Sequence, residues 1–107
     1  MRAISVLSLP LALGACGYTH RFEVRSDEAI QSGIVELNGR TARLQVRDDH
    51  LASGELAVDA DADGRLVIHH KSGTTTICPI GYVTQGEQEP HQVAIEHGKC
   101  TWQFNGH

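Results

Sequence analysis

The stretch that decides the fold reads Gly33-Ile34-Val35-Glu36-Leu37-Asn38-Gly39-Arg40-Thr41-Ala42-Arg43-Leu44. Asn38-Gly39 is a strong hairpin signal, because both residues tolerate the positive φ angles of a two-residue type I′ turn. The turn pairs residues across two strands: Leu37 with Arg40, Val35 with Ala42, and Gly33 with Leu44. One face then carries the apolar residues Val35, Leu37, Ala42, Leu44 and Val46, and only Ile34 departs from the pattern. This stretch therefore predicts an antiparallel β-hairpin with one buried face.

Other glycine turns divide the rest of the chain in the same way. His97-Gly98 predicts a C-terminal hairpin. Asp63-Gly64 best fits a three-residue turn in which Gly64 is left-handed and forms a bulge. The expected partners are Ile95 with Cys100 and Val93 with Trp102 in the first hairpin, and Val58 with Ile68 and Leu56 with His70 in the second. A turn at Lys71-Ser72-Gly73 is expected to direct inward Thr74, Thr76 and Cys78.

The periodicity of the chain predicts an all-β fold. Apolar residues alternate with period two, and no helix-length repeat of 3.6 follows the first 16 residues, although residues 27–32 could form one helical turn. We expect seven or eight short strands in an antiparallel meander, closed as a small barrel or packed as a sandwich. Residues 20–107 form a single β domain, in which 85–90 is a polar loop.

The N-terminus has the pattern of a targeting signal. Arg2 precedes an uncharged, mostly apolar run over residues 3–13, which is too short to span a bilayer. Leu13-Gly14-Ala15-Cys16 follows, and in this motif the chain resembles bacterial lipoproteins. The resemblance implies a signal peptide over residues 1–15, a lipid on Cys16 and a tether over residues 16–19. Gly17, in place of Asp, implies an outer-membrane address facing the periplasm.

Charge and cysteine content narrow the possible partners. Removal of residues 1–15 leaves eight basic and 13 acidic residues, a net charge of −5, and there is no basic run. Nucleic-acid binding is therefore not expected, whereas a basic protein or a cation fits. With Cys16 lipidated in an oxidising compartment, Cys78 and Cys100 are expected to form a disulfide. The alternative is a metal site built from these two cysteines and histidines.

Two sets of side chains could bind a cation. Asp59, Asp61 and Asp63, followed by Gly64, match the first half of a calcium loop, D-x-D-x-D-G, although position twelve is His70 instead of Glu. The alternative is a solvated acidic turn. Seven histidines could supply a copper or zinc site across strands, but adjacent His69 and His70 would point to opposite faces.

No catalytic motif is present: no serine lies in G-x-S-x-G and no glycine-rich loop precedes Lys71-Ser72. We therefore expect a non-enzymatic lipoprotein without a resident cofactor, whose β domain binds a protein or envelope component. In its anchor, size, acidity and disulfide, the chain resembles membrane-bound lysozyme inhibitors. Their Ser-Gly-x-x-Tyr motif is echoed at Ser53-Gly54, with Ala57 at the aromatic position. The resemblance implies contacts through Ser53 and Glu55 on an exposed loop.

Overall fold

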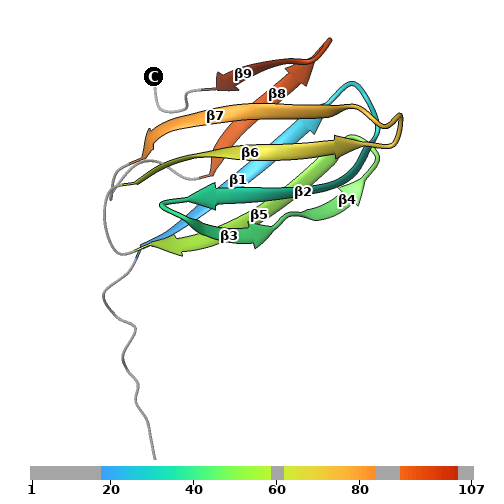
Figure 1. Ribbon diagram of the computed structural model, residues 1–107. Helices are drawn as coiled ribbons and strands as arrows, with labels where there is room; N and C mark the ends of the chain where they lie inside the picture. The colour runs from blue at the N-terminus through green and yellow to red at the C-terminus, as the bar shows by residue number, and fades with distance from the viewer. Residues whose placement is uncertain (1–17, 59–61, 84–89, 104–107) are drawn as a thin grey trace, which may run out of the picture.

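The computed structural model describes residues 18–58, 62–83 and 90–103, and these residues form an all-β sandwich (Figure 1). They contain nine strands where seven or eight were expected: β1 (Tyr18–Ser26), β2 (Ile30–Leu37), β3 (Arg40–Arg43), β4 (Gln45–Asp48), β5 (Leu51–Val58), β6 (Ala62–His70), β7 (Thr75–Val83), β8 (His91–Glu96) and β9 (Lys99–Gln103). The helical turn considered for residues 27–32 is absent from this part of the chain. Asp27 and Glu28 form a bend and Ile30 already begins β2.

The strands form two sheets, with strand orders β4-β5-β1-β8-β9 and β3-β2-β6-β7. The expected meander is wrong, because several strands pair with strands that do not follow them directly in the sequence. β1 lies in the middle of the five-stranded sheet, antiparallel to β5 and parallel to β8. The parallel pair joins residues about 70 positions apart, such as Phe22 and His91. Of the two closures expected, the chain adopts the sandwich, in which the two inner faces bury each other.

Two predicted hairpins are confirmed in register. The Asn38-Gly39 turn has φ angles of 51° and 81°, and Leu37 lies opposite Arg40 as expected. The His97-Gly98 turn has φ angles of 53° and 77°, and Ile95 lies opposite Cys100. Both turns occupy the left-handed region at two consecutive residues, which matches the twist of the strands that they join.

The predicted Asp63-Gly64 hairpin is wrong. β5 does not pair with β6: Leu56 lies opposite His20 of β1, and β6 lies between β2 and β7. Asp63 and Gly64 are inside β6 instead of in a turn. The chain therefore passes from one sheet to the other between Val58 and Ala62, and a local turn signal cannot distinguish that connection from a hairpin.

The core lies between the inner faces of the sheets. Its buried apolar side chains are Phe22, Val24, Ile30, Val35, Leu37, Leu44, Ala52, Val58, Ala62, Leu66, Ile68, Cys78, Val93 and Ile95. Leu44 separates β3 from β4, where the chain crosses between sheets, and packs tightly against Gly33 and Gly54. Val46, expected on the inner face, lies beyond this crossing and is 36% exposed.

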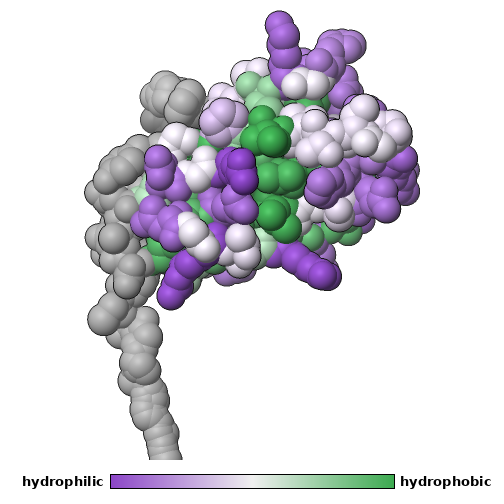
Figure 2. All heavy atoms as spheres, in the orientation of Figure 1, coloured by the Kyte–Doolittle hydropathy of each residue, from purple (hydrophilic) through white to green (hydrophobic). Residues whose placement is uncertain are grey.

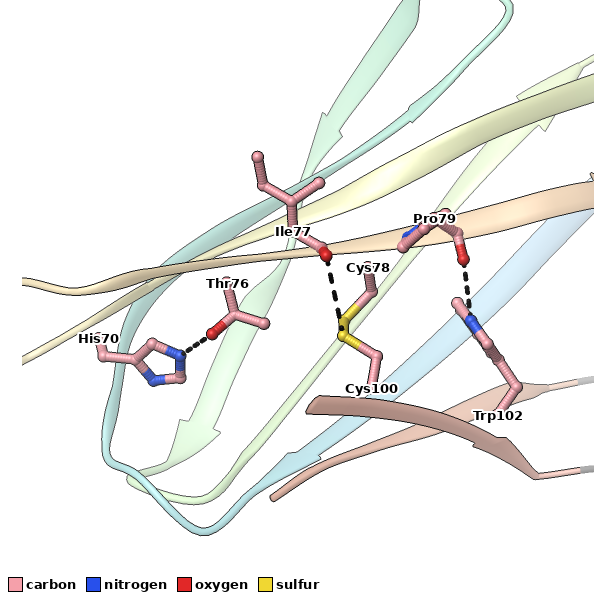
Figure 3. The surroundings of a disulfide bond; sticks show 7 residues. All are labelled: His70, Thr76, Ile77, Cys78, Pro79, Cys100 and Trp102. Carbon is pink, nitrogen blue, oxygen red and sulfur yellow. Dashed lines mark hydrogen bonds between the residues drawn. A yellow bond between two sulfur atoms is a disulfide. The ribbon is translucent and has the colours of Figure 1, made fainter. Parts of the chain in front are cut away.

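The predicted disulfide is present. Cys78 on β7 and Cys100 on β9 are bonded with a Cα–Cα distance of 5.7 Å, and the bond joins the edges of the two sheets (Figure 3). Beside it, the Trp102 indole N–H donates to the Pro79 carbonyl at 2.9 Å. Thr76 is buried with Cys78, as expected, but Thr74 is exposed because it lies before β7 begins. The disulfide and the Trp102–Pro79 hydrogen bond hold the two sheets together at the edge formed by β7 and β9.

Candidate functional site

An exposed apolar stripe crosses the outer face of the four-stranded sheet. Ile34 on β2 lies opposite Val67 on β6, which lies opposite Ile77 on β7. Ile77 is 52% exposed, and the other two side chains are partly exposed. Figure 2 shows a column of apolar side chains on this face, with more polar surface on both sides. We call these three residues the apolar stripe.

Polar pairs border the apolar stripe on both sides. On one side, Arg65 Nε donates to Glu36 Oε1 at 2.7 Å. On the other side, His69 Nδ1 lies 3.1 Å from Thr75 Oγ1. An apolar centre surrounded by solvated polar groups is the usual composition of a protein–protein contact patch. The sheet face can therefore exclude water at its centre while its rim stays hydrated.

A second surface lies on the outer face of the five-stranded sheet, over β1, β4 and β5. It is a shallow hollow of about 540 Å³ that includes Arg21 and Arg47, Arg43 from the end of β3, and the acidic residues Glu23 and Glu55, and we call it the arginine hollow. Ser53 and Glu55, expected on an exposed loop, lie in this hollow but inside strand β5. Arg47 Nε donates to Ser53 Oγ at 3.0 Å. The structure therefore brings the two residues together, in an arginine-rich setting.

The predicted cation ligands are only partly covered by the structure. Asp59 and Asp61 lie outside the described residues. The predicted lipidation site, Cys16, also lies outside them. Asp63 is exposed on β6, opposite Tyr82. Among residues 18–58, 62–83 and 90–103, no three His, Cys, Asp or Glu side chains come together as a metal site. The alternative site using Cys78 and Cys100 is wrong, because a disulfide joins these two sulfurs.

The histidines behave partly as expected. His69 is exposed whereas His70 is 1% exposed, so the neighbours do point to opposite faces. His70 Nε2 lies 2.8 Å from Thr76 Oγ1 within the core. The contact between His20 and His91 was not predicted from the sequence, because these residues meet only through the parallel pairing of β1 and β8. The sequence does carry a signal for the apolar stripe, since Ile34 is the one apolar residue that does not fit its hairpin face.

Comparisons with known proteins do not indicate a function for this chain, so its function is inferred from the apolar stripe and the arginine hollow. No family model, no curated protein and no solved structure matches this chain. Nor do the residues described here include a helix with the length and apolar character needed to span a membrane.

Proposed function

We propose that this chain is a non-catalytic binding module, anchored in the outer membrane by a lipid on Cys16 and facing the periplasm. It binds a protein partner through the apolar stripe. The observation that carries the proposal is the alignment of Ile34, Val67 and Ile77 across three strands, with Ile77 half exposed. The Leu13-Gly14-Ala15-Cys16 motif supports the anchor.

The shape of this surface favours a protein over a small molecule. Small-molecule sites are concave and bury most of their ligand, whereas the apolar stripe lies on the face of a sheet. Protein interfaces bury a few apolar side chains at the centre and leave polar groups at the rim. The Glu36–Arg65 pair, with side chains 29% and 53% exposed, suits such a rim.

A position-specific crosslink tests the binding surface. A photoreactive amino acid replaces Ile77 in the anchored chain, or replaces Thr101 on the outer face of the other sheet as a control. Illumination of intact cells should give a discrete protein adduct from position 77 and none from position 101. Equal adducts from both positions, or none from position 77, would contradict the proposal.

A charge placed in the apolar stripe provides the second part of this test. In the crosslinking chain, Val67→Asp should remove the adduct, because a carboxylate cannot be desolvated against an apolar partner without a large cost. Thr75→Asp, which adds the same charge on the same face beside the stripe, should retain it. An adduct that survives Val67→Asp would show that the stripe does not form the contact.

The anchor has its own test. Cys16→Ser removes the sulfur that would carry the lipid and should abolish the incorporation of radiolabelled palmitate, as measured on the immunoprecipitated protein. Equal labelling of the wild-type chain and Cys16→Ser, or no labelling of the wild-type chain, would contradict the lipid anchor without affecting the proposal about the apolar stripe.

We do not extend the proposal to inhibition of a lysozyme. That activity would place Ser53 and Glu55 against a basic enzyme. Three arginines and two glutamates, Glu23 and Glu55, line the hollow, so this surface has no excess of acidic side chains to attract a basic partner.

A further inference from the structure

An arginine continues the row of the apolar stripe. Arg43 on β3 lies opposite Ile34 on β2, and the same row runs on to Val67 and Ile77. Residues directly opposite each other on neighbouring strands project from the same face of the sheet. Arg43 is exposed, so its guanidinium group stands at one end of three apolar side chains. Three strand spacings of about 4.8 Å place the backbones of Arg43 and Ile77 roughly 14 Å apart.

The surface is hollowed at the arginine end of this row. Ile34 and Arg43 line a hollow of about 390 Å³ together with Leu44 and Val46. β3 ends at Arg43, and after Leu44 the chain continues as β4 in the other sheet (Figure 1). Leu44 is buried, whereas Val46 is 36% exposed. Of the described residues that line this hollow, Arg43 is the only charged one. We call it the crossing hollow.

The charge of Arg43 is available to a ligand. In the neighbouring row, Arg65 has a partner within the sheet, because its Nε lies 2.7 Å from Glu36 Oε1. In the part of the chain that the structure describes, no carboxylate forms an ion pair with Arg43. On its other side Arg43 lines the arginine hollow, whose three arginines outnumber its two glutamates. The surroundings of Arg43 therefore favour an anion.

We propose that the apolar stripe and the crossing hollow together bind a segment of the partner protein in which aliphatic side chains lie beside a carboxylate. The carboxylate binds Arg43, and the aliphatic side chains cover Ile34, Val67 and Ile77. This inference rests on the proposed function and adds the chemistry of the partner. A guanidinium group suits this role, because its planar fork of N–H donors pairs with both oxygens of a carboxylate.

The apolar neighbours make this ion pair stronger than one on an open surface. Aliphatic side chains packed on the apolar stripe exclude water from one side of Arg43, and a charge-assisted hydrogen bond is worth more where the local dielectric constant is low. The charge stands at one end of the row only. It therefore sets the direction in which the bound segment lies, which apolar contact alone would leave open.

Two synthetic peptides test the proposal by nuclear magnetic resonance on the full-length chain. One is acetyl-Gly-Leu-Val-Leu with a free terminal carboxylate, and the other is the same peptide with a terminal amide. The acid should shift the methyl resonances of Ile34, Val67 and Ile77, and it should bind about tenfold more tightly than the amide, because hydrogen bonds to charged groups contribute more than neutral ones. Arg43→Gln should bind both peptides equally. Arg40→Gln, which removes the same charge at the other end of β3, should retain the preference for the acid.

The outcomes separate this inference from the proposed function. Equal affinity of the wild-type chain for acid and amide, a preference that survives Arg43→Gln, or unshifted methyl resonances with both peptides would overturn it. The crosslink from position 77 tests the protein partner independently of these peptides.

Two further ligands identify the source of the carboxylate. A peptide amide with an internal glutamate beside the leucines represents a side-chain carboxylate. Binding of this peptide or of the terminal acid supports the proposal, and the tighter of the two gives the source. Decanoate is an apolar anion without peptide groups. Tighter binding of decanoate than of either peptide would assign the site to a fatty acid and overturn the proposal.

Discussion

At the scale of single residues, Gly64 leaves less room for a side chain than any other glycine that the structure describes. A Cβ atom built there would overlap the Glu36 carbonyl oxygen of β2. Gly64→Ala should therefore destabilise the protein by about 3 kcal/mol or more, because a backbone atom must move. Gly81, its partner on β7, has open space around a Cβ but a φ of 77°, so Gly81→Ala should cost only about 1 kcal/mol. Urea unfolding of both variants checks the difference, and equal losses would contradict it.

An ion pair on the surface lowers the pKa of Asp49. Lys71 Nζ donates to Asp49 Oδ1 at 2.9 Å, and this hydrogen bond and charge hold the pKa of Asp49 below its usual value of 3.8. The resulting stabilisation is present above the unfolded pKa and is lost as the pH falls through the folded pKa. It is small, because both side chains are more than half exposed.

Lys71→Met removes this pair and should raise the pKa of Asp49 towards 3.8. The measurement is a carboxyl titration by nuclear magnetic resonance at low salt. In the wild-type chain, high salt should move the pKa in the same direction, because salt screens the exposed pair. An Asp49 titration that Lys71→Met leaves unchanged would contradict this assignment of the cause.

The burial of individual side chains was predictable where the alternation is regular. Val35 and Leu37 are buried as their hairpin register requires. The prediction was wrong for Val46, because the chain changes sheet at Leu44 and the alternation restarts there. Period two identifies a face within one strand, but it carries no information about the strand that follows a crossing.

At the scale of elements, local turn chemistry predicted some pairings and not others. Asn38-Gly39 and His97-Gly98 connect adjacent antiparallel strands, so the turn itself determines the register. Asp63-Gly64 has a similar composition but lies within β6, where Gly64 allows the close approach of β2. Glycine thus allows a left-handed turn in one place and a close approach of two strands in another. Only the tertiary pairing of the strands distinguishes the two cases.

The disulfide is the covalent link between the edges of the two sheets. Cys78 and Cys100 are separated by 22 residues, which corresponds to about 3 kcal/mol in the chain-entropy model. The double variant with Ser at both positions should therefore melt about 10 °C lower or more. A thermal melt checks this, with reductant as the control: it should lower the melting temperature of the wild-type chain and leave the variant unchanged. Equal melting temperatures would show that the bond adds no stability.

At the scale of the whole molecule, the central feature is β1 between β5 and β8. The all-β class, the disulfide and two hairpins were predictable, because each depends on composition or on residues close in sequence. The parallel pairing of Val24 with Val93 was not, because no turn reports on strands that far apart. The candidate surfaces depend on such pairings: neither the apolar stripe nor the contact between His20 and His91 can be derived from the local pattern alone.

Hydrogen exchange should reflect this arrangement. β1 has a strand on each side, whereas β4 and β9 form the edges of its sheet. The amide of Val24, which is 0% exposed, should exchange close to the rate of global unfolding. The amide of Trp102, which the alternation of the β8–β9 ladder directs away from β8, should exchange much faster. Exchange measured by nuclear magnetic resonance checks the order, and faster exchange at Val24 than at Trp102 would contradict it.

The position of β1 also determines how the domain responds to mechanical force. If the chain is held at Cys16, any pull on a bound partner is transmitted through Tyr18 along the axis of β1. The ladders to β5 and β8 then resist in shear, so that many hydrogen bonds carry the load at once instead of opening in succession. A strand at the edge of the sheet, pulled along the same axis, would share the load over one ladder instead of two. Under the proposed lipid anchor and the proposed partner, attachment through the central strand would let the domain carry load between the membrane and that partner.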